Sequence, residues 1–121
     1  MQQASYEIPE SFAHLSDDAI LERVTDGDLD AYEGIMRHHN QRLYRIARSI
    51  VTDDAEAMDV VQETFIVAFD RLDELREPAA LPGWLARITR NNALMRLRKS
   101  RRMQYMDEPD FDNVLSLAAN I

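Results

Sequence analysis

Apolar residues recur at steps of three and four along most of this chain, a spacing typical of amphipathic helices. Asp28 is the expected cap of the longest such stripe, because a carboxylate there can accept from the first free backbone amides. The pattern predicts one helix from Asp28 to about Val51. Its expected buried face comprises Tyr32, Ile35, Met36, His39, Leu43, Ile46, Ala47 and Ile50.

A second stripe predicts a helix from Asp53 to about Leu75, with Asp53 and Glu56 at the two positions of a capping box. Its expected buried positions are Ala57, Val61, Thr64, Phe65, Ala68, Leu72 and Leu75. Ser16 is the expected cap of a short helix near the N-terminus. That helix is expected to bury Ile20, Leu21 and Val24.

The last helix is expected to start near Pro82, because proline suits the first helical turn. Its expected anchors are Trp84, Leu85, Ile88 and Met95, with Leu94 and Leu97 as further candidates. Only three glycines and four prolines interrupt the 121 residues. The expected fold is therefore all-α, a small bundle of three principal helices plus a short N-terminal one.

The same pattern divides the chain into three parts. Residues 1–15 show no periodicity and are expected to form a flexible N-terminal arm. Residues 16–103 are expected to form one helical domain. The acidic stretch 104–121, whose last nine residues could begin a helix, is expected to be a linker.

Composition excludes several classes of protein. The chain has no cysteine, which rules out a disulfide framework, an iron–sulfur cluster and thiolate zinc sites. No apolar run approaches the roughly 20 residues that span a bilayer, and the first residues lack the features of a signal peptide. From the sequence we expect a cytoplasmic protein with no membrane contact.

Charge is distributed unevenly along the chain, whose formal net charge is -8. The stretch from Asp53 to Glu77 carries nine acids against two arginines. The stretch from Trp84 to Arg102 has no acid and holds half of all basic residues: Arg87, Arg90, Arg96, Arg98, Lys99, Arg101 and Arg102. Arginines neutralise phosphates while Trp84 and the amides of Asn91 and Asn92 can reach bases, so this stretch predicts a nucleic-acid surface.

Metal binding and catalysis find little support in the sequence. Asp26, Asp28 and Asp30 imitate the start of a calcium loop, but Ala31 and Arg37 occupy its glycine and glutamate positions. His38 and His39 are adjacent, so on a helix their side chains diverge by about 100° and cannot share a metal. We expect no metal site, no cofactor and no enzymatic activity.

Asp59 and Glu63 lie four residues apart on one expected helical face, together with Gln62, Ile66 and Asp70. Two carboxylates at this spacing could serve acid–base chemistry, but no nucleophile or pocket is evident beside them. An acidic face with one exposed aliphatic residue favours protein docking over a merely solvated surface.

Two segments carry a family resemblance. Residues 53–72, DDAEAMDVVQETFIVAFDRL, resemble the DAEDVVQETFLRAW-type signature of region 2.2 in bacterial extracytoplasmic-function (ECF) sigma factors. Residues 83–99, GWLARITRNNALMRLRK, resemble their regions 2.3 and 2.4. Residues 21–51 are similar to regions 1.2 and 2.1 in length and pattern. The resemblance covers about residues 15–102 in the family's order.

The resemblance implies an RNA polymerase sigma factor, acting in the bacterial cytoplasm, that helps to recognise and melt the promoter -10 element. It implies docking on the clamp helices of the polymerase β′ subunit through Asp59, Val60, Gln62 and Glu63, with Ile66 on the same face. The loop 76–83 corresponds to the loop that captures a flipped base of the non-template single strand. The implied DNA-binding residues are Trp84, Arg87, Arg90, Asn91, Arg96, Arg98 and Lys99.

Two departures from the family pattern limit what the resemblance implies. Met95 stands where many relatives have aspartate, and Asn92 where they vary, so promoter preference does not carry over. Family members continue into a region 4 helix-turn-helix, so we expect this chain to be an isolated region 2 domain. An anti-sigma factor is a further partner by family analogy. The alternative is a helical protein-interaction module with an acidic docking face and no role in DNA binding.

Overall fold

The chain folds into helices joined by short turns. The structure, a computed structural model, describes residues 12–107. Four α-helices are labelled α2 (Asp17–Thr25), α3 (Tyr32–Arg48), α4 (Asp54–Asp70) and α5 (Leu81–Asp107). Three 3-10 turns join them, η2 (Leu29–Ala31), η3 (Leu72–Glu74) and η4 (Pro78–Ala80). The described residues contain no strand, and the all-α expectation is confirmed.

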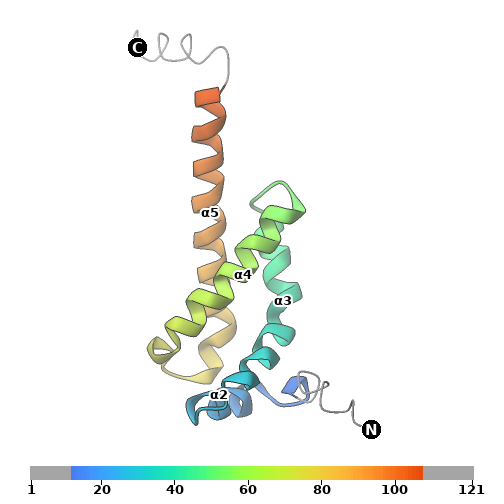
Figure 1. Ribbon diagram of the computed structural model, residues 1–121, viewed down its shortest axis with the longest axis vertical. Helices are drawn as coiled ribbons and strands as arrows, with labels where there is room; N and C mark the ends of the chain where they lie inside the picture. Colours follow the sequence, from blue (N-terminus) through green and yellow to red (C-terminus); the bar gives the residue numbers. More distant parts are fainter. Residues whose placement is uncertain (1–11, 108–121) are drawn as a thin grey trace.

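Three long helices build the core (Figure 1). Helix α4 crosses α5 and packs against α3, α3 also contacts α5, and α2 closes the base of the bundle. The C-terminal end of α5 projects beyond its neighbours. The most completely buried large side chains are Ile20, Ile35, Leu43, Val51, Val60, Thr64, Leu81, Leu85 and Thr89.

Two predicted helix caps are confirmed. The Ser16 hydroxyl accepts from the Ala19 amide at 3.2 Å, and the Asp53 carboxylate accepts from the Glu56 amide at 2.7 Å. Each bond satisfies one of the amides that a helix leaves free at its start. These caps fix where α2 and α4 begin.

The prediction for Asp28 is wrong. Its side chain makes no capping bond, and the turn η2 separates it from α3, which begins at Tyr32. The Asp28 carboxylate instead lies 3.9 Å from the Arg23 guanidinium. Two helix ends were also placed too late, since α3 ends at Arg48 and α4 ends at Asp70.

The expected arm belongs partly to the domain. Phe12 is buried in the core, and Leu15 packs against it. Gly34 allows this approach, because a Cβ there would meet Ile20 Cδ1 at 2.6 Å and the Phe12 carbonyl oxygen at 3.0 Å. The part of the arm from residue 12 therefore docks on α3, and residues 1–11 lie outside the described residues.

Helix α5 differs from its prediction in two ways. Met95 is 62% exposed, while Ala93 and Thr89 occupy the buried positions of its face. The helix also continues to Asp107, into the stretch expected to be linker. The helix expected near the C-terminus lies outside the described residues.

Candidate docking face and nucleic-acid surface

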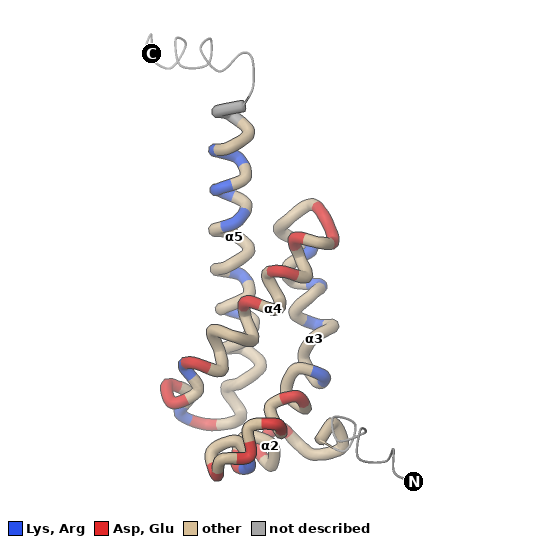
Figure 2. Tube along the Cα trace, in the orientation of Figure 1, with Lys and Arg blue, Asp and Glu red and all other residues tan. Residues whose placement is uncertain are grey.

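Helix α4 presents an acidic face to the outside (Figure 2). Asp59, Gln62, Glu63, Ile66 and Asp70 are all exposed, as their helical spacing predicts. Ile66 is 63% exposed, so an aliphatic side chain stands in solvent among the acids. Such a face suits a partner that offers both positive charge and an apolar side chain.

Val60 does not belong to this face. Its side chain is fully buried, between the equally buried Ala57 and Val61 of the same helix. The motif places Val60 next to the exposed Asp59, but successive helical residues point about 100° apart. Its inclusion among the docking residues is therefore wrong as a surface contact, and Val60 anchors α4 to the core.

An apolar groove lies beside the acidic face, between the start of α3 and the end of α4. It has a volume of about 560 Å³. Exposed Leu29, Ile66 and Phe69 lie along it, with Tyr32 and Phe65 beneath. Its acidic members are Asp30, Glu33 and Asp70. The groove joins apolar area and negative charge on one surface.

Sequence reasoning found Ile66 and Gln62 but missed Leu29 and Phe69 as parts of this surface. Phe69 follows Ile66 by three residues, a spacing that could have placed it nearby. Leu29 gave a weaker signal, an apolar residue between Asp28 and Asp30. Tyr32 joins the two sides of the groove: its ring packs against Phe69, with centroids 5.0 Å apart, and its hydroxyl donates to the Phe65 carbonyl oxygen at 2.7 Å.

Arg96 does not stand with the other arginines of α5. Its guanidinium lies 3.3 Å from the Glu63 carboxylate and 3.7 Å from the Asp59 carboxylate, both on α4. Arg96 thus neutralises part of the acidic face instead of extending the basic surface. All three side chains keep solvent contact, so these pairs contribute little to stability.

The basic stretch of α5 divides into two faces. At about 100° per residue, Arg87, Arg90, Asn91 and Arg98 fall within an arc of roughly 100°. Arg96 lies about 180° and Lys99 about 120° from Arg87. All four residues of the first face are exposed, and no ion pair found within residues 12–107 involves them. We call these four residues the outer basic face.

Lys99 and Arg96 line a second cavity, of about 570 Å³, between α4 and α5. Asn92, Met95, Glu56 and Glu63 also line it. The Asn92 side-chain nitrogen is buried without a hydrogen-bond partner in the described part of the chain. The two adjacent asparagines therefore differ, since Asn91 is exposed and Asn92 faces this cavity.

Trp84 is the aromatic residue at the start of α5. It is partly buried and packs against the core, near the start of α5. The turn η4 leads directly into this helix, so the expected loop 76–83 is helical from Leu81 onward. Arg76, Glu77 and Pro78 before the helix and Gly83 in its first turn are exposed. The structure therefore places the loop 76–83 and the outer basic face next to each other along the chain.

Among residues 12–107, no group of three or more histidine and acidic side chains could hold a metal ion. Within the same residues, no helix combines the length and apolarity of a membrane span.

Comparison with known proteins identifies the family. The Sigma-70 region 2 family model matches residues 35–103. This match takes in most of α3, all of α4 and most of α5, and with them the acidic face and the outer basic face. The groove residues Leu29, Tyr32 and Glu33 precede it. No solved structure matches the chain significantly.

Several curated relatives are RNA polymerase sigma factors. NccH of Alcaligenes xylosoxydans xylosoxydans is 32% identical over 74% of this chain and 47% of its own length. The ECF sigma factor SigW of Bacillus subtilis is 30% identical over 72% of this chain and 46% of its own length. SigE of Mycolicibacterium smegmatis, also an ECF sigma factor, is 32% identical over 92% of this chain and 49% of its own length.

The chain thus spans about half the length of the curated relatives it matches. The family model covers more than half of the chain, in the order of helices that the motifs indicated. The chain belongs to the sigma-70 region 2 family, and it is a region 2 domain of the ECF type.

Proposed function

We propose that this domain acts in an RNA polymerase sigma factor, binding core polymerase through α4 and promoter DNA through α5. The observation that carries the proposal is the separation of two surfaces of opposite charge. The acidic face of α4 adjoins an apolar groove, while the outer basic face of α5 forms no internal ion pair among residues 12–107. One domain can therefore bind a basic protein and a polyanion at once.

Core polymerase is the proposed partner of the α4 surface. Asp59, Gln62, Glu63 and Ile66 are the residues that would meet the clamp helices of its β′ subunit. Leu29 and Phe69 extend this surface into the groove, where a partner side chain would lose contact with water. An anti-sigma factor that covered the groove would compete with polymerase for the same residues.

Promoter DNA is the proposed ligand of the loop 76–83 and the outer basic face. Arg87, Arg90 and Arg98 would follow phosphates, which fixes the position of the strand without reading its sequence. Asn91 and Trp84 would lie beside an unstacked base of the non-template strand at the -10 element. Capture of that base would offset an unstacking cost of a few kcal/mol and so favour melting.

The alternative, an interaction module that binds no DNA, draws support from one observation. Arg96 forms ion pairs with Asp59 and Glu63, so part of the basic stretch makes contacts within the domain and not with DNA. Binding of a single-stranded -10 oligonucleotide separates the two functions. An interaction module has no reason to bind it with an affinity that falls as salt rises.

Charge reversal at the acidic face tests the proposal. We expect Asp59→Arg/Glu63→Arg to weaken binding of the domain to core polymerase by at least about tenfold, because two attractive contacts become repulsive. The control is Glu22→Arg/Asp26→Arg, which changes two exposed acids near α2 by the same total charge. Binding can be measured with a fluorescent domain at fixed salt, after circular dichroism has confirmed that both variants are folded. Equal losses in the two variants would contradict docking at α4.

A further inference from the structure

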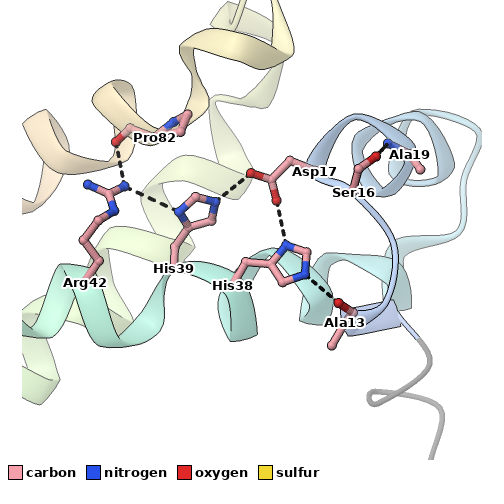
Figure 3. Close-up of polar contacts among 8 residues, drawn as sticks. All are labelled: Ala13, Ser16, Asp17, Ala19, His38, His39, Arg42 and Pro82. Carbon is pink, nitrogen blue, oxygen red and sulfur yellow. Dashed lines mark hydrogen bonds and ion pairs between the residues drawn. The ribbon is translucent and has the colours of Figure 1, made fainter.

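The start of α5 is tied to α3 and α2 by a chain of polar contacts that the proposed docking and DNA surfaces leave unused (Figure 3). Arg42 of α3 donates from Nη2 to the carbonyl oxygen of Pro82 at 2.9 Å. The same nitrogen lies 3.4 Å from His39 Nδ1. His39 Nε2 in turn lies 2.8 Å from the Asp17 carboxylate of α2.

The direction of these hydrogen bonds follows from their partners. The Arg42 guanidinium is only a donor, so His39 Nδ1 must accept from it. His39 Nε2 then carries a proton and donates it to the Asp17 carboxylate. Arg42 therefore donates to His39, and His39 donates to Asp17. These donor and acceptor roles fix the tautomer of His39 and the orientation of its ring.

Burial makes the contact with Pro82 specific. Arg42 is partly buried and His39 is 7% exposed, so water competes poorly for their hydrogen bonds. A positive side chain at the start of a helix is opposed by the helix dipole. Arg42 is held there by the Pro82 carbonyl, whose oxygen has a second lone pair beyond the one used inside the helix.

The first turn of α5 needs such a contact for its orientation. The preceding turn η4 has no side-chain cap at Glu77, so the chain enters α5 without local capping there. Buried Leu81 and Leu85 hold the helix against the core, but apolar packing is not directional. Trp84 lies two residues after Pro82, so a rotation of this turn would move its indole.

We propose that Asp17, His39 and Arg42 are positioning residues, which hold the first turn of α5 so that Trp84 and the loop 76–83 are preset for DNA. This inference rests on the proposed function. Arg42 acts through the backbone of Pro82, and His39 and Asp17 act by orienting Arg42. None of the three is required to touch the DNA.

The experiment compares Arg42→Met, Arg42→Lys and a control, Arg37→Met. Arg37 lies on the same helix, is exposed and pairs with Glu33 at 3.4 Å. Trp84 is the single tryptophan of the chain, so its fluorescence reports on the start of α5 alone. Acrylamide quenching of Trp84 and affinity for a single-stranded -10 oligonucleotide are measured for each variant, at low salt where phosphate contacts are strongest.

We expect Arg42→Met to raise Trp84 quenching about twofold and to weaken oligonucleotide binding about threefold or more, with Arg37→Met unchanged in quenching. Arg42→Lys keeps a donor for Pro82 and should recover part of both effects. Nitrogen NMR should find the Nε2-protonated tautomer of His39 in the wild type and a mixture of tautomers in Arg42→Met.

Unchanged quenching and unchanged oligonucleotide affinity in Arg42→Met would overturn the inference. So would altered quenching with normal affinity, since positioning would then have no effect on DNA. Binding to core polymerase is the second readout, because α4 lies outside the chain of contacts. A wild type that binds neither polymerase nor oligonucleotide would refute the proposed function itself, whereas normal wild-type binding with unaffected Arg42 variants would refute only the inference.

Discussion

His38 illustrates how two contacts determine the charge of one side chain. Its Nε2 lies 2.7 Å from the carbonyl oxygen of Ala13, and its Nδ1 lies 2.8 Å from the Asp17 carboxylate. Both partners are acceptors, so both ring nitrogens must donate and the ring must be protonated. The bond to Ala13 and then the bond to Asp17 raise the pKa of His38, against a smaller opposing effect of burial.

Asp17 is the complementary group of this cluster. Burial alone would raise the pKa of its carboxyl. The hydrogen bonds from His38 and His39 together have a larger effect in the opposite direction, so the pKa of Asp17 is lowered. Charged His38 and ionised Asp17 therefore stabilise each other. They join α3 to α2, and through Ala13 to the docked segment that begins at Phe12.

The His38 contact predicts a loss of stability at alkaline pH. Because its folded pKa is raised, its contribution is complete below the unfolded value of 6.5 and disappears as pH rises through the higher folded pKa. The Asp17 contribution is lost at the opposite end, as pH falls through its lowered pKa. We expect the free energy of unfolding in urea to decrease between pH 6 and pH 9, as folded His38 loses its proton and its charged contact with Asp17.

His38→Gln should remove this pH dependence, because the glutamine amide is neutral and does not lose a proton between pH 6 and pH 9. His14→Gln is the matched control, an exposed histidine two residues before Ser16. If the free energy of unfolding depended on pH in the same way in the wild type and in His38→Gln, the His38 ring would not be charged in the folded state.

The sequence could not reveal this cluster. His39 is buried, as its place in the stripe predicted. The common partner of His38 and His39, Asp17, lies more than twenty residues away along the chain, in the first turn of α2. A contact between distant segments depends on tertiary packing, which periodicity does not report.

At the scale of single helices, the buried stripes of α3 and α4 were predicted well because a 3.6-residue period follows directly from helix geometry. Capping by Ser16 and Asp53 was equally local. The ends of α3 and α4 could not be predicted locally. Val51 lies in the core and Leu75 packs against it, but both come from the segments that follow each helix. An apolar residue continues the stripe whether or not its backbone is helical.

Helix α5 was the least accurately predicted element. Its basic residues were taken as one surface, because a count along the sequence ignores the face on which each side chain lies. In the structure the outer basic face lies apart from Arg96 and Lys99. Met95, which was expected in the core, is exposed, and Ala93 and Thr89 are buried there instead. Small buried residues give a weak hydrophobic signal, so the sequence favoured the larger methionine.

The two faces of α5 predict unequal effects on DNA binding. We expect Arg87→Ala/Arg98→Ala to weaken binding to a single-stranded -10 oligonucleotide and to reduce the slope of log affinity against log salt by about 1.4, since each lost phosphate contact removes about 0.7 for a single strand. Arg96→Ala/Lys99→Ala removes the same charge from the inner face. It should change the slope by less than half as much.

Fluorescence anisotropy across a series of salt concentrations measures both slopes. Equal slope changes in the two double variants would mean that DNA contacts α5 on all sides. The outer basic face would then have no special role.

At the scale of the whole domain, the sequence predicted the polarity of charge, the order of helices and the family. Those features depend on composition and on short motifs. It did not predict the groove, because Leu29 and Phe69 meet only when the start of α3 packs against the end of α4. It also assigned Val60 to the surface on motif position, although the helix turns that side chain into the core.

The groove allows the most direct test of docking through α4. Ile66 is 63% exposed and lies in the groove, whereas Met58 is 57% exposed on the same helix and is not among the residues that line it. An arginine at either position adds the same charge to an exposed site of α4. The two substitutions therefore separate loss of the groove contact from a general effect of charge.

The decisive measurement is the affinity of Ile66→Arg and Met58→Arg for core RNA polymerase, with the wild type measured in parallel. We predict a loss of at least about tenfold for Ile66→Arg and less than about threefold for Met58→Arg, because only the first places a charge in the apolar contact. Binding by Ile66→Arg that equals the wild type would contradict docking through this groove.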